Sequence, residues 1–237
     1  MLAGILFVRM KNHRFIRWKT EVQLLFQEPH YVISLITGAC LMIIAIVVCM
    51  QANGYATAHE GSPVSDLILN AVPVWRVYWL YVFAPVIFWV IALGIGMLNL
   101  RSLPFVLKSL ALFVVIRSMF VSLTHLGVPA DMLMHQGARI PDFIHDLNFS
   151  GDLFFSGHTG LPFLLALIFW RQIKLRIYFL AASVFFGAIV LLGHYHYSID
   201  VIGAFFITYS IFAIAQHLFK SDFDRFSRSR NTVSSLE

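Results

Sequence analysis

The sequence predicts an all-α, polytopic membrane protein whose apolar helices form one bundle. Of its 237 residues, 59% are hydrophobic and only 12% are charged, against about 45–50% and about 25% in typical globular domains. Six long apolar runs contain most of the hydrophobic residues. A soluble domain of this length needs more polar surface than the chain offers. The composition therefore excludes a water-soluble enzyme, a disordered protein and a coiled coil.

The six runs predict six transmembrane helices, because a bilayer core about 30 Å thick needs roughly 20 mostly apolar residues in a helix. They cover residues 31–52, 76–100, 104–126, 153–170, 176–193 and 198–219. No internal repeat or low-complexity segment interrupts them, and a membrane helix tolerates Pro85 inside the second run. We expect one membrane domain over residues 29–220, a basic arm over 1–28 and a tail over 221–237.

The charged residues orient this bundle through the positive-inside rule. With a cytoplasmic N-terminus, most of the 17 Lys and Arg residues lie in cytoplasmic segments: Arg9, Lys11, Arg14, Arg17, Lys19, Arg101, Arg171, Lys174, Arg176, Lys220, Arg225, Arg228 and Arg230. The opposite side collects Glu60, Asp66, Asp131, Asp142, Asp146, Asp152 and Asp200. We expect both termini to be cytoplasmic and the two long connections, 53–75 and 127–152, to be extracytoplasmic.

The N-terminal arm has its apolar residues before its basic ones, which is the reverse of the order in a signal peptide. We expect it to lie at the cytoplasmic membrane surface. The two cysteines, Cys40 and Cys49, both fall in the first apolar run. The sequence therefore predicts no disulfide framework.

Two polar segments stand at the extracytoplasmic starts of inward-running spans. One runs from Gly151 to Thr159 and enters the fourth span, and the other runs from His194 to Asp200 and enters the sixth. Because both spans start on the same side, His158 should lie at a depth similar to that of His196 and Asp200. The sequence thus predicts that two histidines and a carboxylate converge at one mouth of the bundle.

These residue types suit phosphoryl transfer. His196 and Asp200 are four residues apart, which on a helix places them on one face, and a carboxylate on one imidazole nitrogen leaves the other as a nucleophile. His158 would transfer the proton. The hydroxyl of Ser156 and the backbone of Gly157, near a helix N-terminus, would bind phosphate. The expected reaction proceeds through phosphohistidine at His196.

Simpler interpretations exist for each of these residues. A histidine at a membrane boundary often serves only in packing, and His-x-His with a nearby Asp also occurs in zinc and copper sites. Arg117 lies within the third span, where a charge is costly, and we favour phosphate binding there over a structural ion pair. Lys108 is nearer the cytoplasmic end and can snorkel. Tyr195 and Tyr197 flank His196, where they could contact a lipid head group.

At these residues the sequence resembles the sphingomyelin synthase-related branch of the type 2 phosphatidic acid phosphatase (PAP2) superfamily. The resemblance rests on Gly151-Asp152 with Ser156-Gly157-His158-Thr159, and on His194-x-His196-Tyr197-Ser198-Ile199-Asp200-Val201. Weaker similarities are Pro63-Val64-Ser65-Asp66 with Pro73, and Arg117 to Thr124. Together they cover roughly residues 60 to 215.

The resemblance implies six helices, an exoplasmic active site and a catalytic triad of His158, His196 and Asp200. In such enzymes a phosphorylated head group moves from a glycerophospholipid to an alcohol such as ceramide, without a metal. The chain lacks the Lys and Arg-Pro signature of the ordinary lipid phosphatases, and Val190 stands six residues before His196 in place of Ser-Arg. Tyr195 stands between the two histidines where the synthases usually have an acid.

We therefore predict a lipid phosphotransferase that uses no cofactor or metal, has membrane lipids as its partners and binds no nucleic acid. The predicted catalytic residues are His158, His196 and Asp200, and the predicted substrate-binding residues are Arg117, Asp152, Ser156, Gly157 and Tyr197. The alternatives are a phosphatase with the same site, in which water is the acceptor, and a non-catalytic lipid-binding or scaffold protein. A homo-oligomer is compatible with the sequence, which does not determine the oligomeric state.

The predicted orientation can be tested with single cysteines in a background that lacks Cys40 and Cys49. Gly137→Cys should react with an impermeant maleimide added to intact cells, because residues 127–152 are expected outside. Ser229→Cys should not react, because the tail is expected inside. The reverse labelling pattern would overturn the orientation and place the proposed site on the wrong face.

Overall fold

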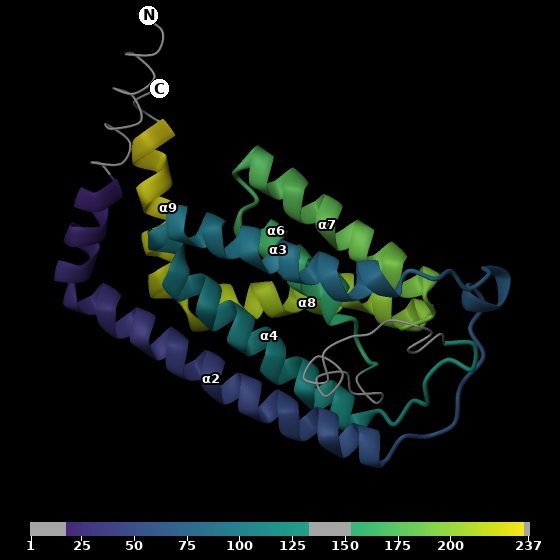
Figure 1. Cartoon of the computed structure of the whole chain (residues 1–237). Helices are drawn as coiled ribbons and strands as arrows, with labels where there is room; N and C mark the ends of the chain where they lie inside the picture. Colours follow the sequence, from purple (N-terminus) through teal and green to yellow (C-terminus); the bar gives the residue numbers. More distant parts are fainter. Residues whose placement is uncertain (1–17, 133–152, 235–237) are drawn as a thin grey trace, which may run out of the picture.

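The computed structural model describes residues 18–132 and 153–234, with side chains up to Ser227, and this part of the chain is a bundle of helices without strands (Figure 1). Residues 18–27 are also helical. The longer helices are α2 (Pro29–Ala58), α3 (Tyr78–Leu98), α4 (Leu103–Leu123), α6 (Gly157–Ile168), α7 (Ile173–Leu192), α8 (Ser198–Leu218) and α9 (Lys220–Ser234). The 3-10 turns η1 (Leu69–Ala71) and η2 (Leu100–Ser102) lie between them. The all-α membrane fold predicted from the sequence is confirmed.

Five of these helices are long and apolar enough to cross a membrane, and the predicted count of six is not confirmed. The fourth predicted span forms α6, which has only 12 residues. At 1.5 Å per residue it is about 18 Å long, well short of a bilayer core of about 30 Å. The position Gly137 and the substrate-binding candidate Asp152 lie outside the described residues.

Helix α2 contacts the bundle through one narrow stripe. Its buried positions include Tyr31, Gly38, Ala45 and Ala52, which are seven residues apart. A Cβ atom built on Gly38 would lie 3.1 Å from the Cβ of Leu107 on α4, so the small side chains allow a close approach of the two helices, as at many membrane helix interfaces. Most large apolar side chains of α2 point outward, among them Ile33, Ile36, Ile43, Ile44 and Val47. This outward apolar surface suits contact with lipid.

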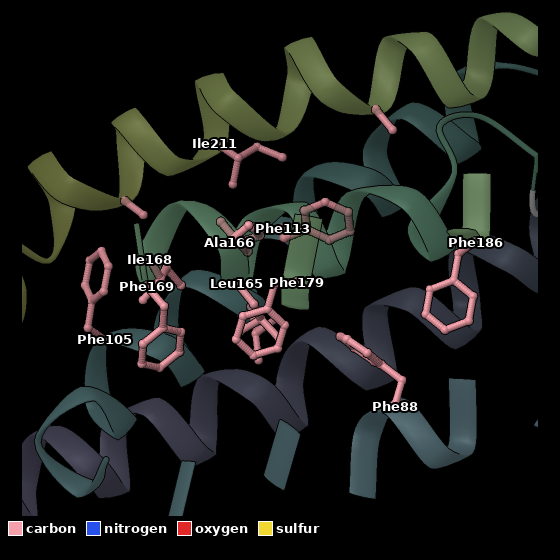
Figure 2. Close-up of a cluster of buried hydrophobic side chains, with 14 of the residues drawn as sticks. Phe88, Phe105, Phe113, Leu165, Ala166, Ile168, Phe169, Phe179, Phe186 and Ile211 are labelled. Carbon is pink, nitrogen blue, oxygen red and sulfur yellow. The ribbon is translucent and has the colours of Figure 1, made fainter. Parts of the chain in front are cut away.

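Helix α6 lies in the centre of the bundle, where the main buried cluster joins it to its neighbours (Figure 2). The cluster includes Phe88 of α3, Phe113 of α4, Leu165 of α6, Phe186 of α7 and Ile211 of α8. A Cβ atom on Gly160 would lie 2.7 Å from the ring of Phe113 and 2.8 Å from Oγ1 of Thr208. Only glycine fits there, and three helices meet closely as a result. Since lipid is as apolar as these side chains, the cluster stabilises the bundle through tight packing rather than removal from water.

A buried ion pair joins α9 to the rest of the bundle. It lies at the end of the bundle that is opposite to the N-terminus of α6. Nζ of Lys108 lies 2.7 Å from Oδ2 of Asp222, and each side chain is only about a tenth exposed. The hydroxyl of Ser34 donates to Oδ1 of Asp222 at 2.6 Å and accepts from Lys108 at 2.8 Å. The cation that the sequence suggested could snorkel is therefore paired with an acid and joins α2, α4 and α9.

Removing one partner of this ion pair should destabilise the fold. We expect Asp222→Ala to lower the unfolding free energy by about 3–5 kcal/mol, because the buried ammonium loses its counter-charge. Thermal unfolding of purified protein in detergent measures the effect. The matched control is Asp224→Ala, which removes the exposed Lys220–Asp224 pair and should cost about 1 kcal/mol or less. Equal effects of the two substitutions would contradict a structural role for the buried pair.

Candidate active site

The two polar segments predicted from the sequence meet through the starts of α6 and α8. The backbone N–H of Ser156 donates to the carbonyl of Asp200 at 3.1 Å. Ser156 is the N-cap residue of α6, and Asp200 lies in the first turn of α8. This bond connects residues 44 positions apart and brings His158 to the same end of the bundle as His196.

His196 and Asp200 form the predicted pair, although by a different local structure. Nδ1 of His196 lies 3.4 Å from Oδ2 of Asp200, and both side chains are almost fully buried. The sequence suggested two positions on one helix face, but α8 begins only at Ser198. Asp200 instead folds back over the helix start, where Oδ2 also accepts from the backbone N–H of Tyr197 at 3.0 Å. The carboxylate thus caps α8 and faces the imidazole with the same oxygen.

The second histidine faces this pair. The ring centroids of His158 and His196 are 6.5 Å apart, with the ring planes inclined by 63°. His158 also packs on Tyr81 of α3 at a centroid distance of 4.7 Å and lies 6.3 Å from the ring of Phe186. The convergence of two imidazoles and one carboxylate is therefore present in the structure.

Arg117 reaches the start of α6 from α4. Its Nε donates to the carbonyl of Phe155 at 2.7 Å, and the residue is 8% exposed. A Cβ atom on Gly157 would lie 3.3 Å from Nε and 3.7 Å from Cζ of Arg117. The absence of a side chain at Gly157 thus leaves room for the guanidinium next to His158. This places a positive charge beside the proton-transferring candidate.

Two other predicted substrate-binding residues have structural contacts. The buried hydroxyl of Ser156 accepts from the backbone N–H of Thr159 at 3.4 Å and from its hydroxyl at 3.3 Å, as an N-cap. The hydroxyl of Tyr197 donates to the carbonyl of Gly127 at 2.8 Å and accepts from the N–H of Val64 at 3.1 Å. Ser156 therefore stabilises the start of α6. Tyr197 holds together the loops that contain Val64 and Gly127.

A cavity of about 240 Å³ opens beside His158 and Arg117. Its other lining residues come from α2, α3, α4, α6 and α7: Cys49, Pro85, Phe88, Trp89, Phe113, Val114, Gly157, Leu161, Pro162 and Phe186. The walls are mostly apolar, and the two basic side chains lie on them. Such a cavity suits a lipid whose phosphate is held by Arg117 and whose chains contact the aromatic residues.

Tyr195 adds an aromatic wall near the histidines. Its ring stacks on that of Tyr81 at 4.2 Å, and Tyr81 in turn packs on His158. Burial, and secondarily the neighbouring Tyr78, raises the pKa of Tyr195 to about 12. The phenol is therefore neutral at physiological pH. The residue between the two histidines of this segment thus adds no negative charge to the site.

The loop between α2 and α3 supports the site through Asp66, to which the sequence assigned no role. Oδ2 of Asp66 accepts from the backbone N–H and the hydroxyl of Ser198, both at 2.7 Å, at the start of α8. Oδ1 accepts from the N–H groups of Ile68 and Leu69 at 2.9 and 3.0 Å. Burial acts to raise the pKa of Asp66, but these hydrogen bonds outweigh it and lower the pKa below its usual value. The only sequence signal was the Pro63-Val64-Ser65-Asp66 similarity.

The metal interpretation receives no support from side-chain clustering. Within the described ranges, no group of three or more His, Cys, Asp and Glu side chains could hold a metal ion. A structural zinc site has four protein ligands and a catalytic one three, whereas His196 and Asp200 provide two here. The arrangement suits an oriented nucleophilic imidazole better.

A known protein family resembles the part of the chain that contains these residues. Residues 150–218, which contain both polar segments and helices α6 to α8, match the family model of the PAP2 superfamily C-terminal domain. This match supports membership of the PAP2 superfamily. No curated protein and no solved structure matches the chain significantly. The PAP2 match, in a helical membrane protein, supports an enzyme of the lipid phosphatase or phosphotransferase class.

Asp66 should act as a positioning residue. We expect Asp66→Asn to lower kcat by about tenfold or more, with a smaller effect on KM. The amide has only one oxygen and so cannot accept all the hydrogen bonds that the two carboxylate oxygens accept, and a hydrogen bond to a charged group is worth about 1.5–3 kcal/mol. Steady-state lipid turnover measures both constants. Asp131→Asn, which changes an exposed acid of the second connection, is the control and should leave kcat unchanged. Equal activity of the two variants would refute this role.

Proposed function

We propose that this protein transfers phosphate or a phosphorylated head group from a phospholipid to a lipid alcohol, through a phosphohistidine at His196. The observation that carries the proposal is the convergence of two imidazoles, one of which faces a buried carboxylate at 3.4 Å. Arg117 beside Gly157 adds the positive charge that a phosphate needs. The PAP2 match over residues 150–218 agrees with this class of chemistry.

In the first step, Nε2 of His196 attacks the phosphorus of the donor lipid. Nδ1 keeps its proton and donates a hydrogen bond to the carboxylate of Asp200, which stabilises the positive charge that develops on the ring. As the new P–N bond forms, the P–O bond to the diacylglycerol oxygen breaks. Protonated His158 gives its proton to that oxygen, so a neutral alcohol leaves. Arg117 stabilises the charge on the non-bridging oxygens.

In the second step, the acceptor alcohol restores the enzyme. Neutral His158 takes the proton of the acceptor hydroxyl, and the oxygen attacks phosphorus from the side that the first alcohol vacated. The P–N bond breaks and its electron pair returns to Nε2 of His196. Over the two steps one proton has passed through His158 from the acceptor hydroxyl to the released alcohol, and the enzyme regains its initial protonation state.

Two features favour a lipid acceptor over water. Among the described residues, Arg117 is the one permanently charged side chain on the cavity wall, which suits the single negative charge of a phosphodiester better than the double charge of a terminal phosphate. The wall is otherwise mostly apolar, as a site for two successive lipids requires. A ceramide- or diacylglycerol-like alcohol from the same leaflet fits both features.

The second candidate function is a lipid phosphate phosphatase with the same site. It is favoured by the position of His196 and His158 at one end of the bundle, near the loops that contain Asp66 and Gly127. Incomplete exclusion of water would divert part of each turnover to hydrolysis. We therefore expect transfer accompanied by some hydrolysis.

Product analysis with purified protein in vesicles tests the proposal. Phosphatidylcholine, phosphatidylethanolamine and phosphatidic acid are supplied in turn, each with and without ceramide or diacylglycerol, and the lipids formed are identified by mass spectrometry. We expect a new phospholipid that depends on the added alcohol. If phosphatidic acid is turned over fastest, with free phosphate as product and no response to either alcohol, the phosphatase replaces the transferase.

Variants of the three catalytic candidates test the mechanism in the same assay. His196→Ala should abolish turnover and any acid-labile, base-stable label from a phosphate-labelled donor. Asp200→Asn should lower the rate strongly, by up to about 10⁴-fold if it fixes the wrong tautomer, while the protein remains folded. His158→Ala should slow formation of the intermediate. Full activity of His196→Ala, or loss on chelation with restoration by zinc, would end this mechanism.

A further inference from the structure

A second cavity lies far from the histidines, at the end of the bundle that carries α9. It has a volume of about 470 Å³, within the range of about 300–1,000 Å³ typical of ligand sites. It is lined by residues of α6, of the turn after α6, of α8 and of α9: Phe163, Leu167, Ile168, Trp170, Arg171, Tyr209, Phe212, Gln216, Phe223, Phe226 and Ser227. None of these residues lines the catalytic cavity.

The short length of α6 explains why this cavity exists. The helix ends at Ile168, whereas α8 continues to Leu218 and leads directly into α9. Figure 1 shows α9 lying across the end of the bundle, so it covers the space beyond the last turn of α6. The ion pair between Lys108 and Asp222 holds α9 in this position. The lining of the cavity is mostly apolar and aromatic, and its exposed members are Trp170, Arg171 and Tyr209.

The chain at Trp170 and Arg171 is positively charged. From Phe169 to Arg176 in the first turn of α7 it contains Arg171, Lys174 and Arg176 and no acidic residue. The guanidinium of Arg176 stacks on the ring of Trp170 at 4.9 Å from its centroid.

We propose that this cavity binds an anionic phospholipid of the leaflet at this end of the bundle, with an acyl chain among Phe163, Phe212 and Phe226 and its phosphate at Arg171. An apolar cavity beneath a basic rim matches the two parts of such a lipid. A tryptophan at the rim is typical of the membrane interface, and basic side chains at that level attract anionic head groups. This second lipid site is separate from the catalytic cavity and does not depend on the proposed reaction.

Photolabelling tests this site with the full chain in vesicles of phosphatidylcholine and phosphatidylglycerol. Two probes are compared, a phosphatidylglycerol and a phosphatidylcholine, each with a photoreactive group at the end of one acyl chain. We expect the phosphatidylglycerol probe to label peptides that contain Phe212, Phe223 or Phe226, which lie only on this cavity. Labelling there should be several times weaker with the phosphatidylcholine probe.

Matched variants identify the two parts of the site. Arg171→Gln should lower the phosphatidylglycerol label by about fivefold, the loss expected for one basic contact near the membrane surface. Lys174→Gln removes a neighbouring exposed cation that does not line the cavity and should have a smaller effect. Ser227→Phe should fill the cavity and block labelling by either probe. Thermal unfolding verifies that each variant is folded.

Equal labelling by the two probes, or an equal response to Arg171→Gln and Lys174→Gln, would show that the basic rim does not select the lipid. Labelling that persists in folded Ser227→Phe would show that the acyl chain lies elsewhere on the bundle. The catalytic variants of His196 and His158 should leave this labelling unchanged.

Discussion

The carboxylate and carbonyl of Asp200 connect the parts on which the site depends. One carboxylate oxygen caps the start of α8 and faces His196, while the backbone carbonyl accepts from Ser156 at the start of α6. Capping, orientation of the nucleophile and alignment of the two helices thus depend on one residue. A capping carboxylate near the positive end of a helix is also stabilised in its charged form, which suits its second role beside the imidazole.

The membrane explains how polar groups are distributed in the rest of the bundle. Outward surfaces are apolar, and helices recognise one another through small residues such as Gly38 and Gly160. The ion pairs of the described bundle lie at its two ends. At one end lies the pair of the proposed catalytic centre, and at the other the pair of Lys108 and Asp222 fixes α9.

Loops contribute to the catalytic end as much as the helices do. Asp66 binds the start of α8, and Tyr197 joins the backbone of Val64 to that of Gly127. These contacts bring the loop after α2 and the loop after α4 together beside His196. A site held in this way can be rigid at the nucleophile even though its residues stand at helix ends, because each loop has several hydrogen bonds to the helix that it supports.

The sequence by itself determined the fold class and which polar residues lie at one end of the bundle. Apolar runs of about 20 residues predict membrane helices directly, since the bilayer sets the length that each must have. The order of the spans placed His158 near His196 and Asp200, and it required no knowledge of packing. Arg117 stood out because a charge inside an apolar run is costly.

Only the tertiary structure decided how these residues meet. The sequence could not show that α6 ends after 12 residues, because apolar residues continue beyond Ile168 into a turn. It could not show that Asp66, Ser156 and Tyr197 hold loops and helix starts, because hydrogen bonds between distant segments depend on the packing of the whole chain. The second cavity likewise exists because α9 folds across the end of a short helix. Local patterns determine where helices form, whereas the spaces between helices depend on how all of them pack together.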